Sequence, residues 1–179
     1  DYSIGFDQNV THLLWAPDGQ SIYFISDRHA TDQIYALSLS TGSIRKITEG
    51  KHNYIGIAWA GDKLVAARQS MSRPTELYLV DPQNGDAKQL TTVNDNIFNQ
   101  LTMGNVEERW IETTDGKRML TWVIYPPHFD KNKKYPALLY CEGGPQSTVS
   151  QFWSYRWNFQ MMAAHDSIIV APNRRGLPG

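Results

Sequence analysis

The residues best suited to chemistry stand in two short polar stretches of the sequence. Glu142-Gly143-Gly144-Pro145 follows the apolar run 136–141, and Asn173-Arg174-Arg175 follows the apolar run 167–172. Glycine lets a reacting group approach the backbone N–H closely, because it carries no Cβ. A carboxylate beside guanidinium groups offers either an ion pair or contacts for a charged ligand. We therefore take these two stretches as the candidate site.

No serine, histidine or cysteine has the spacing of a known nucleophilic or metal site. Serine hydrolases carry the nucleophile in a Gly-x-Ser-x-Gly turn. Gly19-Gln20-Ser21 begins such a turn, but Tyr23 stands where the second glycine is required. Cys141 ends an apolar run, so we expect it in a buried strand, and it lacks the sequence around known thiol nucleophiles. We expect surface or loop positions, without metal-ligand spacing, for His12, His29, His52, His128 and His165. The sequence predicts no triad member, no metal site and no cofactor.

The elements around the two polar stretches predict a parallel crossover unit. The runs 136–141 and 167–172 are typical of strands buried in a mostly parallel sheet. Residues 152–165 between them repeat large apolar side chains every three or four positions, which predicts a helix. Strand, helix and strand in this order form a right-handed crossover, which makes the two strands parallel. We also expect a hairpin from Val106–Thr113 and Arg118–Tyr125.

Two copies of a repeat fill the first half of the chain. Trp15-Ala16-Pro17-Asp18-Gly19 recurs 44 residues later as Trp59-Ala60-Gly61-Asp62, and Ile34-Tyr35 recurs 43 residues later as Leu77-Tyr78. A period of this length, with four strands in each copy, predicts blades of a β-propeller. We expect one further strand at Ile97-Phe98. The aromatic residues of the repeat are expected in the core between blades: Trp15, Tyr35, Trp59 and Tyr78.

Composition excludes two classes of partner. The net charge is -1, and no basic patch of the kind that binds nucleic acid stands out. No apolar run approaches the roughly 20 residues that span a bilayer.

Two blades do not close a propeller, which needs about four. We therefore expect further blades before Asp1.

Taken together, these motifs resemble the prolyl oligopeptidase family. The repeat resembles blades that this family shares with TolB-like proteins, and the second half separates the two groups. Trp-Val-Ile-Tyr-Pro-Pro at 122–127, Tyr-Pro-Ala-Leu-Leu at 135–139, Gly-Gly-Pro at 143–145 and Val-Ala-Pro-Asn-Arg-Arg-Gly at 170–176 are similar to the opening of that family's hydrolase domain. Within the family, the chain resembles the acylaminoacyl-peptidase and dipeptidyl-peptidase branches, especially secreted dipeptidyl peptidases of Bacteroidetes.

The resemblance implies a β-propeller followed by an α/β-hydrolase domain. Residues 1–103 would be about two C-terminal blades, and 104–179 the start of the hydrolase domain, ending before the nucleophile turn. It implies a serine exopeptidase that hydrolyses short peptides through an acyl-enzyme, in which this piece, lacking the triad, is inactive. It also implies a peptide substrate, contacts with the remainder of its own chain, a periplasmic or secreted location, and it allows a homodimer. The alternative is a TolB-like propeller that binds protein partners without catalysis.

The resemblance also gives the two polar stretches a role. In α/β-hydrolases one oxyanion donor comes from the loop after the third strand. That loop would be the one holding Gly143 and Gly144, with the Gly144 N–H as donor; the alternative is a plain strand-to-loop turn. Relatives often carry His or Tyr where this chain has Glu142. We expect Glu142 either to pair with Arg174 or Arg175, or to face the cleft and attract a peptide's N-terminal ammonium.

Overall fold

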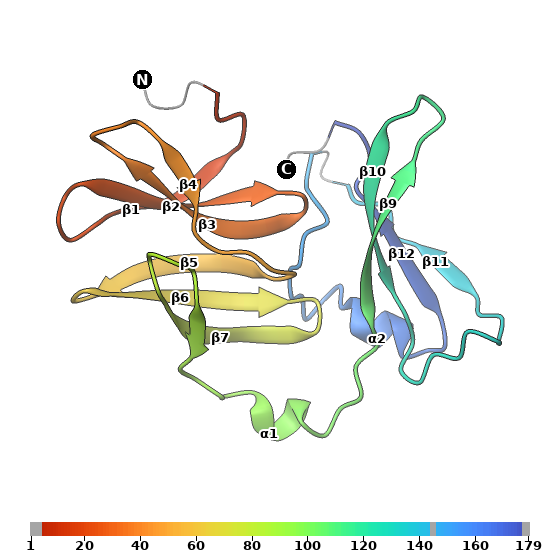
Figure 1. Cartoon of the computed structure of the whole chain (residues 1–179). Helices are drawn as coiled ribbons and strands as arrows, with labels where there is room; N and C mark the ends of the chain where they lie inside the picture. Colours follow the sequence, from red (N-terminus) through yellow and green to blue (C-terminus); the bar gives the residue numbers. More distant parts are fainter. Residues whose placement is uncertain (1–4, 144–145, 177–179) are drawn as a thin grey trace.

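The computed structural model describes residues 5–143 and 146–176 of the chain. These residues form three four-stranded sheets and two short helices (Figure 1). The first two sheets lie one above the other, and the third stands beside them.

Each of the first two sheets is an antiparallel meander in chain order, which confirms the predicted repeat. We call them the first and second blade. The first blade consists of β1 (Val10–Trp15), β2 (Ser21–Arg28), β3 (Thr31–Ser38) and β4 (Ile44–Lys46). The second blade consists of β5 (Asn53–Ala60), β6 (Lys63–Ser70), β7 (Arg73–Val80) and β8 (Ala87–Gln89).

The turn between β1 and β2 forms as its sequence predicts. The Asp18 carboxylate accepts a hydrogen bond from the Gln20 N–H at 2.9 Å, and the Gly19 N–H donates to the Ala16 carbonyl at 2.9 Å. Gly19 has a φ of +68°, a conformation that favours glycine. Aspartate and glycine thus close the turn by the mechanisms that make them common in turns.

The two blades share an apolar core. Ile34 and Leu64, one from each blade, are both fully buried in it. The Trp59 ring of the second blade meets the Tyr23 ring of the first edge-on, with centroids 5.2 Å apart. Trp59 therefore packs between blades as predicted, and Tyr78 also lies against this core.

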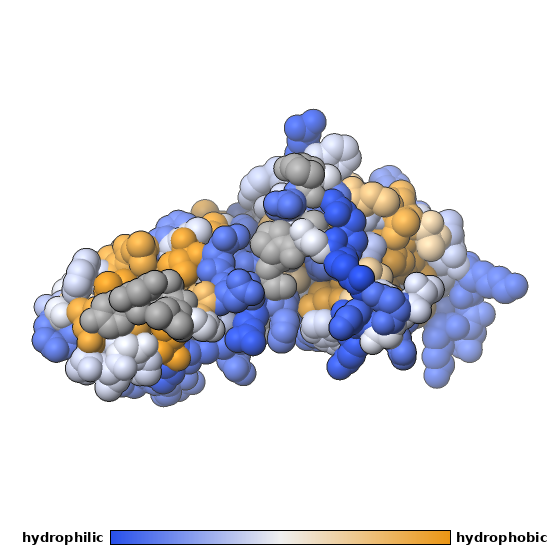
Figure 2. Space-filling view, turned by 90° about the horizontal axis from the view of Figure 1, so that it is seen from above, coloured by the Kyte–Doolittle hydropathy of each residue, from blue (hydrophilic) through white to orange (hydrophobic). Residues whose placement is uncertain are grey.

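Trp15 differs from the prediction, because its side chain is 60% exposed. Successive strand residues point to opposite faces, and Leu14 takes the position facing the second blade. Trp15 therefore lies on the other face of the first blade. The equivalent face of the second blade is the one that carries Trp59 and packs against Tyr23 of the first blade. Tyr35 lies on this same outer face, where it is buried against Phe24 and Phe6. Figure 2 looks down on the molecule and shows apolar residues gathered over this blade.

The third sheet has the order β11-β12-β10-β9. Its strands are β9 (Val106–Glu112), β10 (Arg118–Ile124), β11 (Ala137–Leu139) and β12 (Ile168–Pro172). The hairpin β9–β10 and the parallel pair β11–β12 are both confirmed. Trp122, fully buried at the centre of this sheet, donates its indole N–H to the Val149 carbonyl at 2.8 Å.

The predicted helix over 152–165 is wrong for most of its length. Helix α2 spans only Phe159–Ala163. The Ser154 hydroxyl accepts hydrogen bonds from the Arg156 and Trp157 N–H groups, and the Asn158 side chain caps α2 by accepting from Met161 N. Serine and asparagine compete in this way with helical backbone bonds. Apolar spacing alone therefore overestimated the helix.

Two strand predictions also need correction. Residues 136–141 shorten to β11, at the edge of the third sheet, and Leu138 and Leu139 are 48% and 61% exposed. Cys141 is exposed rather than buried. The strand expected at Ile97 is instead the short helix α1 (Asp95–Phe98). Leu138, Leu139 and Ile97 are apolar, but no element among the described residues covers them.

The division of the chain at residues 103 and 104 stays a prediction, and it falls in the segment between α1 and β9. Neither described helix is long and apolar enough to cross a membrane.

Candidate functional site

The two predicted polar stretches follow neighbouring parallel strands at one edge of the third sheet. Leu139 pairs with Val170, and the Tyr140 N–H extends the ladder by donating to the Val170 carbonyl at 2.8 Å. Glu142 and Gly143 come directly afterwards, whereas Gly144 and Pro145 lie outside the described residues. Parallel sheets bind ligands at this carboxyl edge. The strand order thus places both stretches where a site is expected.

Packing against neighbouring atoms does not require a glycine at position 143. A Cβ built on Gly143 would meet no atom within 4 Å. The space beside its backbone is therefore open, which suits the approach of a ligand. Whether Gly143 or Gly144 donates to an oxyanion stays a prediction.

Glu142 lies next to the Tyr140 hydroxyl. Burial, followed by the hydrogen bond and the charge of Glu142, raises the pKa of Tyr140 to about 12. The Tyr140 ring is fixed by edge-on contact with Phe159 of α2, with ring centroids 4.8 Å apart. Tyr140 thus links α2 to the start of the loop that carries Gly143.

Arg175 has an acidic partner other than Glu142. Its guanidinium pairs with Asp115, in the turn between β9 and β10. A hydrogen bond from Thr113 and then the pair with Arg175 lower the pKa of Asp115 to about 2. Arg174 lies beside Arg175 in the same loop. The pairing of Glu142 with an arginine stays a prediction.

The sequence assigned no role to Asn173, yet it fixes the segment that follows the Gly-Gly-Pro loop. Its side chain accepts from the Val149 N–H at 2.8 Å and donates to the Val149 carbonyl at 3.1 Å. Its own N–H donates to the Leu120 carbonyl at 2.8 Å. An asparagine directly after a strand is the signal that would have marked it, because its amide can both donate to and accept from the backbone of one residue.

A buried polar network joins the blades to the segment after this loop. Asn53, at the start of β5, donates to the Ser150 hydroxyl at 2.8 Å and accepts from the Gln151 N–H at 3.2 Å. The same Asn53 oxygen accepts from the Asp32 N–H at 3.1 Å, and Gln151 accepts from the Met71 N–H at 3.3 Å. Asn53, Ser150 and Gln151 are all buried. Residues 150 and 151 are therefore held by the second blade, and Asn53 also ties the first blade to this network through Asp32.

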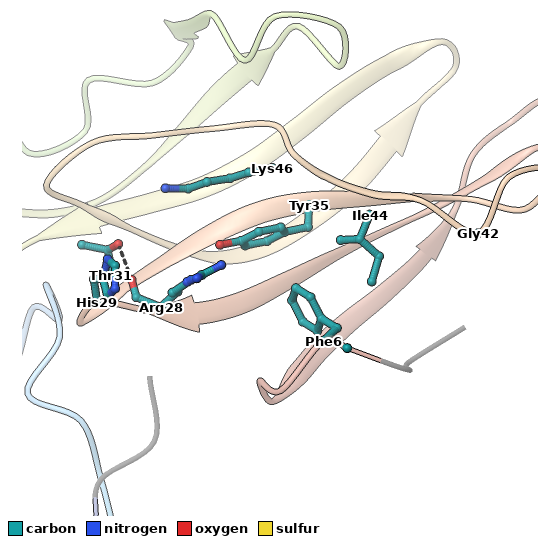
Figure 3. A pocket seen from close by; sticks show the side chains of 9 residues that line it. Phe6, Arg28, His29, Thr31, Tyr35, Gly42, Ile44 and Lys46 are labelled. Atoms are coloured by element: carbon teal, nitrogen blue, oxygen red, sulfur yellow. Dashed lines mark hydrogen bonds between the residues drawn. The ribbon is translucent and has the colours of Figure 1, made fainter. Parts of the chain in front are cut away.

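A hollow of about 560 Å³ on the outer face of the first blade is a weaker candidate (Figure 3). Arg28 and Lys46 line it, and the buried Tyr35 hydroxyl between them has no hydrogen-bond partner among the described residues. One repeat later, Tyr78 lies on the face that packs against the first blade. The hollow therefore has the character of a blade-packing face, and we do not assign a ligand to it.

The described residues hold no cluster of metal-ligating side chains, and the absence of a catalytic triad stays a prediction. No three His, Cys, Asp or Glu side chains in this part of the chain come together as metal ligands. The His52 ring packs edge-on against Tyr54 and that of His29 against Trp110. The candidate site thus consists of the loop after β11 and the residues that support it.

Comparison with known proteins gives matches over almost the whole chain. Dipeptidyl-peptidase 5 of Porphyromonas gingivalis is 51% identical over 174 residues, which is 97% of this chain and 25% of that protein. Dipeptidyl-peptidase 5 of Porphyromonas endodontalis is 51% identical over 159 residues, 89% of this chain and 23% of that protein. No protein-family profile matches the sequence. The chain spans about a quarter of the length of these curated relatives.

Solved structures show the same arrangement. Acylaminoacyl peptidase of Pyrococcus horikoshii superposes with a TM-score of 0.82 at 26% identity, covering 99% of this chain and 27% of that one. Dipeptidyl peptidase 4 of P. gingivalis has the same fold, with a TM-score of 0.67 at 21% identity over 96% of this chain and 25% of that one. In sequence and fold, therefore, the chain matches a quarter-length segment of peptidases of the prolyl oligopeptidase family, as its motifs predicted.

Proposed function

We propose that this chain is part of a serine exopeptidase that removes short units from peptides through an acyl-enzyme. The observation that carries the proposal is the 51% identity to two dipeptidyl-peptidase 5 proteins over almost the whole chain. In this proposal the nucleophile, the acid and the histidine come from other parts of a longer protein. The blades restrict access to a site between the propeller and the hydrolase domain.

The loop after β11 supplies an oxyanion donor in this proposal. Hydrolases of this class use one backbone N–H from such a loop, and in this proposal Gly143 or Gly144 provides it. Support comes from the position of the loop at the carboxyl edge of β11 and from the open space beside Gly143. Removing an oxyanion donor typically costs about 3–4 kcal/mol of transition-state stabilisation.

Glu142 has two roles open to it. As a support it would hold the loop, in line with its position beside Tyr140. As a substrate anchor it would face the cleft and attract the N-terminal ammonium of a peptide, which would favour exopeptidase action. The rival function, a propeller that only binds protein partners, has no use for the parallel pair β11–β12.

Activity assays on two proteins test the proposal. The longer protein is expected to hydrolyse dipeptidyl chromogenic substrates and to be labelled on serine by a fluorophosphonate. The 179-residue chain alone is expected to do neither, because no Gly-x-Ser-x-Gly turn occurs in it. Turnover with serine labelling by the 179-residue chain, or its absence from the longer protein, would contradict the proposal.

A further inference from the structure

A small polar pocket of about 210 Å³ lies between the connection after β4 and the strands β6 and β7. Lys51, Arg68 and Arg73 line it, and Glu76 is the one carboxylate among its lining residues. Lys51 also approaches Glu108 of the third sheet at 4.0 Å. The pocket therefore opens at the end of the second blade that meets the third sheet, and positive groups outnumber negative ones in its wall.

The carboxylates around this pocket are already engaged. Glu76 is 5% exposed and accepts hydrogen bonds from the Thr91 hydroxyl and from the backbone and side chain of Asn94. Asp95 pairs with Arg73 at 2.9 Å. The donors to Glu76 are neutral, so Glu76 keeps its negative charge, and it faces Arg68 across the β6–β7 ladder. Lys51, Arg68 and Arg73 still outnumber this one carboxylate in the wall of the pocket.

Arg68 is the cation that lacks an acidic partner. In the part of the chain that the structure describes, no carboxylate lies within 4.0 Å of its guanidinium. The guanidinium instead lies over the Tyr78 ring, 3.6 Å from its centroid. One of its N–H groups is engaged by the Tyr54 hydroxyl. A guanidinium carries five N–H donors in a planar fork, so others remain to suit the oxygens of a carboxylate or phosphate.

His52 adds a second donor without an acceptor. Its Nε2 is buried and has no hydrogen-bond partner in the part of the chain that the structure describes. Gly50 lets the ring lie this close to the backbone, because a Cβ at Gly50 would come within 2.5 Å of the His52 ring. Burial and then the charge of Arg68 lower the pKa of His52 to about 4, so the ring is neutral at physiological pH. A neutral imidazole protonated on Nε2 is a hydrogen-bond donor.

We propose that this pocket binds a small oxyanion, with Arg68 and His52 as donors and with Lys51 and Arg73 adding positive potential. The recognised group is a carboxylate or phosphate, which two sources could supply: the carboxyl end of a peptide or a free inorganic anion. The site goes beyond the proposed peptidase function and does not depend on it, because binding is measured without turnover.

Histidine NMR of the full chain tests the site directly. The chain is titrated with inorganic phosphate, with N-acetylglycine and with its neutral amide, at constant ionic strength. The His52 signal, assigned with His52→Gln, is expected to shift saturably with an anion and not with the amide. A shift with N-acetylglycine identifies a carboxylate ligand, and a shift with phosphate alone identifies a free inorganic anion. No shift with either anion, or an equal shift with the amide, overturns the proposal.

Charge-removing variants separate this site from general attraction to a cationic surface. Arg68→Gln is expected to weaken anion binding about tenfold or more, the usual consequence of losing a charge-assisted hydrogen bond. Lys63→Gln, which removes an exposed cation outside the pocket, is expected to leave binding unchanged. If Arg68→Gln does not fold, Lys51→Gln is the second variant, because the Lys51 side chain is 58% exposed and its replacement leaves the packing unchanged. The expected loss of anion affinity is smaller than for Arg68→Gln. Equal affinity in Lys51→Gln, Arg68→Gln and wild type contradicts the assignment.

Discussion

The Gln160 side chain pairs with both backbone polar groups of Gly104. Its oxygen accepts from the Gly104 N–H at 2.8 Å, and its nitrogen donates to the Gly104 carbonyl at 3.0 Å. The same nitrogen donates to the Ser72 hydroxyl at 3.0 Å, in the turn between β6 and β7. One buried amide from α2 therefore joins the second blade, the connecting segment and the third sheet.

Replacing Gln160 with leucine is expected to destabilise the chain. Leucine is close to glutamine in size but leaves the Gly104 groups unpaired in a site where Gln160 is only 5% exposed. Each orphaned group costs about 1–3 kcal/mol. Urea unfolding should show this loss, whereas Gln20→Leu, at an exposed turn position, should show little. Equal stability of the two variants would mean that Gln160 is not a structural support.

Gly104 is required for a different reason, close packing. A Cβ at this position would lie 1.8 Å from the Tyr125 carbonyl oxygen, a backbone atom that cannot move away alone. Gly104→Ala is therefore expected to lower the urea midpoint strongly. Gly56→Ala is the matched control, because a Cβ there meets nothing within 4 Å. A Gly104→Ala variant as stable as Gly56→Ala would show that the segment before β9 can shift without cost.

Asp32 is expected to make the chain less stable as the pH rises. It faces Asp27 across the β2–β3 ladder. Burial and then the charge of Asp27 raise the pKa of Asp32 to about 7. The folded chain thus holds this proton more tightly than the unfolded chain, whose aspartate pKa is about 3.9. The contribution of Asp32 to stability is present below about pH 4 and is lost as the pH rises to about 7.

His52 acts in the opposite direction over part of this range, because its pKa is lowered to about 4. The effect of Asp32 is therefore measured as the difference between Asp32→Asn and wild type in urea unfolding from pH 4 to pH 8. We expect the free energy of unfolding of Asp32→Asn, relative to that of wild type, to increase with rising pH by on the order of a few kcal/mol at most. Asp27→Asn should flatten the wild-type profile, because it removes the neighbouring charge. A difference that does not change with pH would contradict the raised pKa of Asp32.

Local sequence signals were sufficient for much of the fold. The repeat with Pro17-Asp18-Gly19 predicted the two blades, because turn residues and strand periodicity act within a few positions of each other. The apolar runs also predicted the parallel pairing of β11 with β12. For the site, the same runs placed Glu142 and Gly143 correctly after β11.

Features that depend on distant partners were not predictable in this way. Asn53 and Ser150 meet across 97 positions of sequence, and nothing local to either residue indicates the other. The exposure of Trp15 follows from which face of the first blade is covered, not from its own repeat. Arg175 pairs with Asp115 in a turn 60 positions away, so strand order alone could not give its partner.

Substitution of Glu142 with glutamine separates its two proposed roles. In the chain itself the variant is expected to lower the pKa of Tyr140 from about 12, because the Glu142 charge contributes to that value after burial. Ultraviolet titration of tyrosinate detects the change, and Tyr140→Phe assigns the signal. An unchanged titration would place Glu142 away from Tyr140.

In the longer protein, the same variant is compared by stability and by kinetics. Removing one partner of a buried ion pair costs about 3–5 kcal/mol, whereas an exposed pair contributes about 0–1 kcal/mol. If Glu142 supports the loop, Glu142→Gln should lower stability and slow every substrate alike. If it anchors the substrate, stability should stay near wild type, with KM raised for peptides that have a free N-terminal amine and unchanged for N-blocked ones. The anchor role rests on Coulomb attraction, so its KM effect should shrink with added salt. A variant with wild-type stability and wild-type KM for both kinds of peptide would exclude both roles.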